Sequence, residues 1–173
     1  MATTDFPSVV CDAGPLIHLD ELDCLDLLGN FGKILIPKIV WNEAIAHRPR
    51  LLLRNIPAAS ILEGGAESSP QLLSLSDSLE LDAGEKAAIA LMEGGSAKLF
   101  LCDDAAARLA AESLGFAVHG TIGILVRSIR QATRTRQQVL ELLQEIPQRS
   151  SLHISRRLLE AVIAEVGKHA TGF

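Results

Sequence analysis

The chain of 173 residues has few aromatic side chains, with five Phe, one Trp and no Tyr. Its core must therefore come from Leu, Ile, Val and Ala, and a hydrophobic fraction of 48% is typical of a globular protein. No apolar run approaches the roughly 18 residues that a membrane span requires. The N-terminal segment MATTDFPSVV also lacks the basic start and apolar stretch of a secretory signal. We expect one domain with a helical extension and no membrane association.

Cysteine and histidine are also scarce. Cys11, Cys24 and Cys102 lack metal-ligand spacing, and Cys11 and Cys102 lie in apolar, strand-like runs. Buried, reduced thiols of a cytoplasmic protein are the expected state. The histidines stand singly, so neither a zinc site nor a histidine-activated nucleophile is expected. There is no GxxxxGK[ST] phosphate loop either.

Charge is distributed unevenly along the chain. The net charge of −5 argues against a protein that coats nucleic acid, but residues 120–173 carry eight Lys/Arg and four acids, whereas residues 1–119 carry a net −9. A basic end beside an acidic body suits an arm that grips phosphate next to a centre that collects metal ions. A solvated helical face explains the same charges.

Short apolar runs alternate with helical segments. Strands are expected over 9–11, 33–36, 61–62, 98–102 and 116–119; helices are expected over 16–30 in two pieces, 37–47, 71–79, 82–93, 105–114, 120–131, 136–146 and 155–168. This alternation predicts an α/β protein with a parallel sheet covered by helices on both faces. Residues 1–131 would form the main domain, and 132–173 a C-terminal helical extension packed on it.

The stretch VVCDAGPLIH over 9–18 places a carboxylate at the end of a strand. Asp12 follows the apolar run, and Pro15 suits the first turn of a helix. Asp12 either caps that helix or lies at the carboxyl edge of the sheet, where open α/β sheets bind ligands. Asp103 follows the strand 98–102 and would reach the same edge.

Two glutamates can join these aspartates. Glu43 lies on the helix after the second strand, and Glu85 is the third residue of a helix that Asp82 would cap, which forms a capping box. Each also has a structural explanation, since Glu43 can face solvent and Glu85 can serve the cap alone. Asp103 and Asp104 can also share the capping of the following helix with one of them idle in the chemistry, and Asp104 is expected to be the idle one or to lie behind the metal ligands.

Four clustered carboxylates repel one another, so a stable cluster implies a bound cation. Oxygen ligands favour Mg²⁺ or Mn²⁺, which lower the pKa of bound water and neutralise charge on a phosphate. Phosphodiester hydrolysis follows as the reaction class. A haloacid-dehalogenase-type phosphatase is excluded because Gly14 stands where its second Asp is needed, and a phosphoacceptor receiver lacks its paired acids at Cys11-Asp12.

Four segments taken together resemble PIN-domain proteins of the predicted nucleic-acid-binding branch related to VapC-type toxins. They are VVCDAGPLIHL (9–19), ILIPKIVWNEA (34–44), LDAGEKAAIAL (81–91) and LFLCDDAAARLAAESLGFAVHGTIGILV (99–126). The resemblance implies a Rossmann-like α/β/α sandwich with about five parallel strands, and an acidic centre of Asp12, Glu43, Glu85 and Asp103 that binds metal and carries catalysis, with Asp104 beside it. It also implies Mg²⁺- or Mn²⁺-dependent ribonuclease activity, a homodimer and, in many members, a small antitoxin partner. Ala105 stands where this branch often has Arg, while Arg108 is available.

We hypothesise a single-strand endoribonuclease, the toxin of a toxin–antitoxin pair. The alternatives are a non-catalytic RNA- or partner-binding module of the same fold and a housekeeping RNA-processing nuclease. Thr121 is expected to cap its helix rather than hold a phosphate. The leucine-rich stretch Leu16–Leu28 is a candidate dimer surface.

Overall fold

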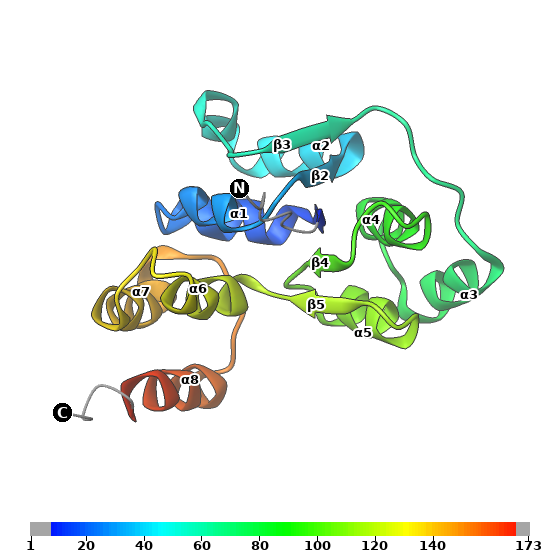
Figure 1. Cartoon of the computed structure of the whole chain (residues 1–173). Coiled ribbons are helices and arrows are strands. Elements are labelled where there is room, and N and C mark those ends of the chain that lie inside the picture. The colour runs from blue at the N-terminus through cyan, green and yellow to red at the C-terminus, as the bar shows by residue number, and fades with distance from the viewer. Residues whose placement is uncertain (1–7, 169–173) are drawn as a thin grey trace, which may run out of the picture.

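A single parallel sheet of five strands organises the chain in the computed structural model, which describes residues 8–168 (Figure 1). The strand order is β3-β2-β1-β4-β5, and Val9 at the centre pairs with Ile34 on one side and Leu99 on the other. The strands are β1 (Val9–Cys11), β2 (Ile34–Pro37), β3 (Ala59–Leu62), β4 (Leu99–Leu101) and β5 (Ala117–His119). The order reverses between β1 and β4, which makes the carboxyl edge there a topological switch point.

Successive residues of the central strands face opposite sides of the sheet. Val9 and Cys11 belong to one hydrophobic cluster and Val10 to the other, as the period of two in a strand requires. The first cluster is covered by α1 (Ala13–Glu21), η1 (Leu25–Asn30), α2 (Lys38–His47), η2 (Pro49–Leu53), α6 (Thr121–Arg130), α7 (Arg136–Arg149) and α8 (Arg156–Lys168). The second is covered by α3 (Pro70–Leu79), α4 (Ala83–Glu93) and α5 (Ala105–Ser113). The predicted α/β/α sandwich is confirmed.

The leucine-rich stretch Leu16–Leu28 is buried within the protein. Its leucines are at most 7% exposed and belong to the first hydrophobic cluster. The expectation that they form a dimer surface is wrong, because this stretch makes α1 and η1 internal helices between the sheet and the later helices. The threefold leucine spacing identified a buried face but not what covers it.

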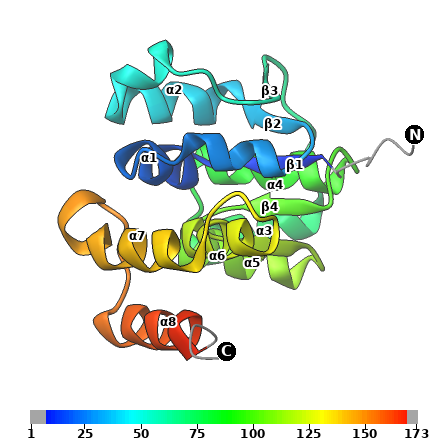
Figure 2. The same cartoon turned by 60° about the vertical axis from the view of Figure 1, so that its left-hand side comes forward.

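The C-terminal helices lie along one side of the fold. Val139, Leu143 and Ile146 of α7 are fully buried in the first cluster, whereas α8 packs mainly on α7 and lies farthest from the sheet (Figure 2). Helix α7 continues past its predicted end at Ile146, and Pro147 is accommodated within its last turns. Within residues 8–168, no helix is both long and apolar enough to cross a bilayer.

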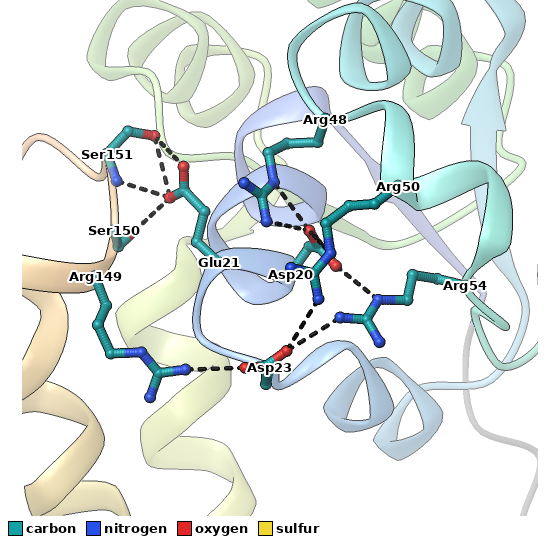
Figure 3. A network of polar contacts seen from close by, with 9 residues as sticks. All are labelled: Asp20, Glu21, Asp23, Arg48, Arg50, Arg54, Arg149, Ser150 and Ser151. Atoms are coloured by element: carbon teal, nitrogen blue, oxygen red, sulfur yellow. Dashed lines mark hydrogen bonds and ion pairs between the residues drawn. The ribbon is translucent and has the colours of Figure 1, made fainter.

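A polar network joins the carboxyl ends of α1 and α2 (Figure 3). The Asp20 side chain is fully buried, and its oxygens accept hydrogen bonds from Arg48 Nη2 at 2.6 Å and Arg54 Nε at 3.0 Å. Arg50 Nε lies 3.3 Å from the same carboxylate. Burying a carboxylate is tolerated when it is paired and hydrogen-bonded. This network fixes α1 against α2, the two helices that follow β1 and β2 out of the sheet.

Candidate active site

Asp12 links the end of β1 to the start of α1. Its backbone N–H donates to Leu101 O at 2.9 Å, and the residue is only 6% exposed. Its side chain makes no capping hydrogen bond to α1, and Cys102 Sγ lies 3.6 Å from its Oδ2. Helix capping therefore does not account for this carboxylate, which leaves its place at the sheet edge as the feature to explain.

Burial disfavours the ionised form of Asp12. Loss of hydration raises its pKa to about 7, and the charges of Glu43 and Asp82 act in the same direction, whereas the backbone N–H of Ala13 opposes the rise. The carboxylates that raise this pKa come from α2 and from the residue before α4. Segments far apart in the sequence thus bring negative charge to one place.

Glu85 and Asp82 lie at the start of α4. Asp82 Oδ1 accepts from Glu85 N at 2.8 Å and Glu85 Oε2 accepts from Asp82 N at 2.9 Å, so the predicted capping box is confirmed. Burial nevertheless raises the pKa of Glu85 to about 7, opposed by the bond from Asp82 N and reinforced by Asp82, Asp104 and Asp12. Structural capping and membership of the acidic set coexist in one side chain.

Glu43 approaches this same turn from α2. Its pKa is raised by burial and by Asp82, with His47 opposing. A Cβ at Gly84 would lie 3.2 Å from Glu43 Oε2 and 3.3 Å from Asp82 Oδ1. A residue larger than glycine would therefore crowd these two carboxylates.

Asp103 is held by three hydrogen bonds. Its Oδ1 accepts from Thr121 N at 2.7 Å, and its Oδ2 accepts from Thr121 Oγ1 at 2.6 Å and faces His18 Nδ1 at 2.8 Å. The expectation that Thr121 caps α6 is wrong, since Gly120 is the N-cap residue and the Thr121 hydroxyl donates to Asp103. The carboxylate of Asp103 takes the place of a cap at the N-terminus of α6, where negative charge is favoured.

Asp104 caps α5. Its Oδ1 accepts from Ala106 N at 2.8 Å and Ala107 N at 2.9 Å. Its charge still reaches the acidic set, because it contributes to the raised pKa of Glu85. The two adjacent aspartates therefore differ in their contacts, because Asp103 binds Thr121 at the start of α6 and Asp104 binds the first turn of α5, the helix that directly follows it.

The oxygen-rich composition of this set fits a hard divalent cation. Asp12, Glu43 and Glu85 all have raised pKa values from burial and mutual repulsion, which a bound cation would relieve. Within the described range, 8–168, no three His, Cys, Asp or Glu side chains surround one point closely enough to hold an ion together. The acids are grouped electrostatically, and Asp103 Oδ1 accepts one hydrogen bond, from Thr121 N, which leaves it a lone pair for a cation, whereas its Oδ2 contacts both Thr121 Oγ1 and His18 Nδ1.

Two residues of this region were missed by the sequence analysis as parts of the site. Asp82 was assigned only a capping role, although its charge acts on Asp12, Glu43 and Glu85. Its position one turn before Glu85 was the available signal. His18 contacts Asp103 across 85 residues of sequence, and no local pattern indicates that pair.

Comparison with known proteins agrees with this architecture. No curated protein matches the sequence significantly. A family model described as a PIN domain (DUF3368) matches residues 8–168, which is nearly the whole chain and includes both C-terminal helices. The match covers the strands and all the acidic residues described above. The chain therefore belongs to the PIN-domain family.

Proposed function

We propose that this protein is a Mg²⁺- or Mn²⁺-dependent endoribonuclease acting on single-stranded RNA. PIN domains are in general nucleases, and this chain belongs to that family. The observation that carries the proposal is the acidic set at the switch point of the sheet, where Asp12 is buried at the end of β1 and Glu43, Glu85 and Asp103 are half-buried, and where the pKa values of Asp12 and Glu85 are raised to about 7. Desolvated carboxylates that repel one another destabilise the folded protein, so their presence at this edge of the sheet points to a functional role.

In this proposal, Asp12, Glu43, Glu85 and Asp103 hold the cation, with Asp104 at the periphery. The bound cation would activate water for attack and neutralise charge that develops on the phosphate. Asp12 and Asp103 follow strands and are the most rigidly placed. His18 and Thr121 orient Asp103 through the three contacts described above.

The test is RNA cleavage by the purified full chain with Mn²⁺, with EDTA, and by the Asp12→Asn variant. Asp77→Asn, on the exposed side of α3, is the matched control. We expect cleavage that requires the metal, survives Asp77→Asn and disappears in Asp12→Asn. Metal-dependent cleavage that persists in Asp12→Asn would refute the assignment of the site.

We further propose that the protein acts in the cytoplasm as the toxin of a toxin–antitoxin pair, as a homodimer. The resemblance of the segments around Asp12, Glu43, Glu85 and Asp103 to VapC-type toxins supports this role. A partner would block the centre by placing a basic side chain among these carboxylates. Arrest of growth on expression, absent in Asp12→Asn, is the expected result, and light scattering tests the dimer.

The division into a main domain over 1–131 and a helical extension over 132–173 stays a prediction. The burial of Val139, Leu143 and Ile146 in the first cluster supports an extension that packs on the main domain. Truncation after residue 131 should then give a protein that aggregates, because it would remove these side chains and expose the part of the first cluster that they cover.

A further inference from the structure

A cavity of about 650 Å³ lies between the main fold and its last helix. Residues from α5, β5 and α6 form one side, and the connector before α8 together with α8 itself forms the other. In Figure 1 these elements occupy the lower part of the molecule, with α8 below α6. The volume falls within the range of about 300–1,000 Å³ that is usual for small-molecule sites.

Most of the cavity wall is apolar. Val118 and Ile122 contribute from the sheet side, and Leu158 and Val162 contribute from α8. Leu158 is 55% exposed although it lines the cavity. A cavity whose wall is largely apolar accommodates a ring such as a nucleobase.

The polar side chains that line the cavity are Asp103, Arg108, Glu112, His119 and His153, and His119 is the one with an unpaired buried nitrogen. Its Nδ1 is buried and has no hydrogen-bond partner among the described residues. Burial lowers the pKa of His119, and the charges of Arg127, Arg130 and Arg108 lower it further, which favours the neutral ring. A neutral imidazole offers one donor and one acceptor, which is the pairing that the edge of a nucleobase presents.

Three arginines act on His119, and one of them, Arg108, lines the cavity. Within residues 8–168, Arg108, Arg127 and Arg130 form no ion pair, and the same holds for Arg136 and Arg157, whereas the arginines at 48, 50, 54, 134, 149 and 156 are ion-paired. Arg127 lies over the Phe31 ring, 4.9 Å from its centroid, and its Nε has no hydrogen-bond partner in the part of the chain that the structure describes. The guanidinium of Arg108 beside an apolar wall favours a ligand that combines a ring with a phosphate.

The cavity adjoins the acidic set, because Asp103 belongs to both. Asp103 lines it together with Arg108 and Gly120. A Cβ at Gly120 would lie 2.7 Å from Asp103 Oδ1 and 2.8 Å from Arg108 Nη1, so the carboxylate and the guanidinium are close neighbours. A polymer whose phosphate reaches Asp103 must therefore place an adjoining unit at the mouth of this cavity.

We propose that this cavity binds one nucleotide of the RNA strand, next to the phosphate that is cleaved. The base lies against Val118, Ile122 and Leu158, and Arg108 contacts the adjoining phosphate. Helix α8 thereby completes the substrate site rather than only covering the fold. The inference rests on the proposed function for its RNA ligand.

The test measures binding without cleavage, with EDTA present, so that it does not depend on nuclease activity. Fluorescence anisotropy compares the full chain on short labelled homopolymer RNAs and on an abasic sugar–phosphate strand of equal length. We expect the wild type to prefer RNA over the abasic strand by about tenfold, within the range that one stacked base contributes. Leu158→Trp places a bulkier side chain where the base would lie against α8 and should abolish that preference.

Leu158→Trp tests the contact with the base, Arg108→Gln tests the contact with the phosphate, and Leu73→Trp is the control for Leu158→Trp. Leu73→Trp, on the exposed face of α3 and 46% exposed in the wild type, should bind like the wild type. Arg108→Gln should weaken both strands alike and reduce the salt dependence of Kd by about one phosphate contact. An unchanged preference for RNA in Leu158→Trp would overturn the proposal and leave the cavity to a protein partner. Base-dependent binding without metal-dependent cleavage would support nucleotide binding in the cavity and refute the proposed nuclease activity.

Discussion

Replacing Asp12 with Asn should stabilise the metal-free protein at neutral and alkaline pH. Asp12 is 6% exposed, and its pKa of about 7 lies well above the ordinary value of 3.8. The folded state therefore holds a proton that the unfolded chain releases between about pH 4 and pH 7. Stability falls as the pH rises through this window, and the full cost of the ionised carboxylate is present above it. Asn keeps the shape of the side chain and removes that cost.

The magnitude follows from the same pKa. Each tenfold change in proton affinity is worth about 1.4 kcal/mol, so a pKa of about 7 in place of 3.8 costs the folded protein about 4 kcal/mol at pH 8. For a chain of this length, each kcal/mol moves Tm by about 2–4 °C. The Tm of Asp12→Asn should therefore exceed that of the wild type by about 10 °C at pH 8 and match it below about pH 4.

Thermal unfolding followed by circular dichroism in EDTA, at pH values from acid to alkaline, measures this difference. Asp77→Asn on α3 is the control for a change of net charge and should follow the wild type at every pH. Adding Mn²⁺ at pH 8 should stabilise the wild type and leave Asp12→Asn unchanged. A lower Tm for Asp12→Asn at pH 8 would refute the reasoning, because it would mean that the ionised carboxylate contributes to stability.

Two further predictions concern positions away from the carboxylate of Asp12. Asp20→Asn should lower the free energy of unfolding in urea by about 3–5 kcal/mol, because it leaves the arginines beside a buried neutral side chain. Asp23→Asn is the control and should lower it by less than about 1 kcal/mol, because the Asp23 side chain is 61% exposed. Equal losses for the two variants would show that the network is not buried in solution. Gly120→Ala should lower the free energy of unfolding by about 1–3 kcal/mol and slow RNA cleavage, because its Cβ would meet Asp103 and Arg108. Gly64→Ala, whose Cβ would have no described atom within 4 Å, should leave stability and cleavage unchanged. Full activity of Gly120→Ala would contradict the tight contact.

The sequence by itself determined the features that depend on neighbours a few residues apart. The capping box joins Asp82 and Glu85, which are three residues apart, so its hydrogen bonds can be predicted from two residue types. The strands around Val9 and Phe100 follow from short apolar runs, and their alternation with helices predicts the parallel sheet. Asp12 at a strand end was identified for the same reason.

Only the tertiary structure decided which distant groups meet. The contact of Asp103 with His18 spans 85 residues, and the hydroxyl of Thr121 binds Asp103 rather than its own helix because α6 begins beside the end of β4. The leucines of Leu16–Leu28 became core rather than surface once the later helices covered them. These contacts depend on how whole helices pack on the sheet. Their free energy comes from residues far apart in the sequence, so local sequence patterns do not predict them.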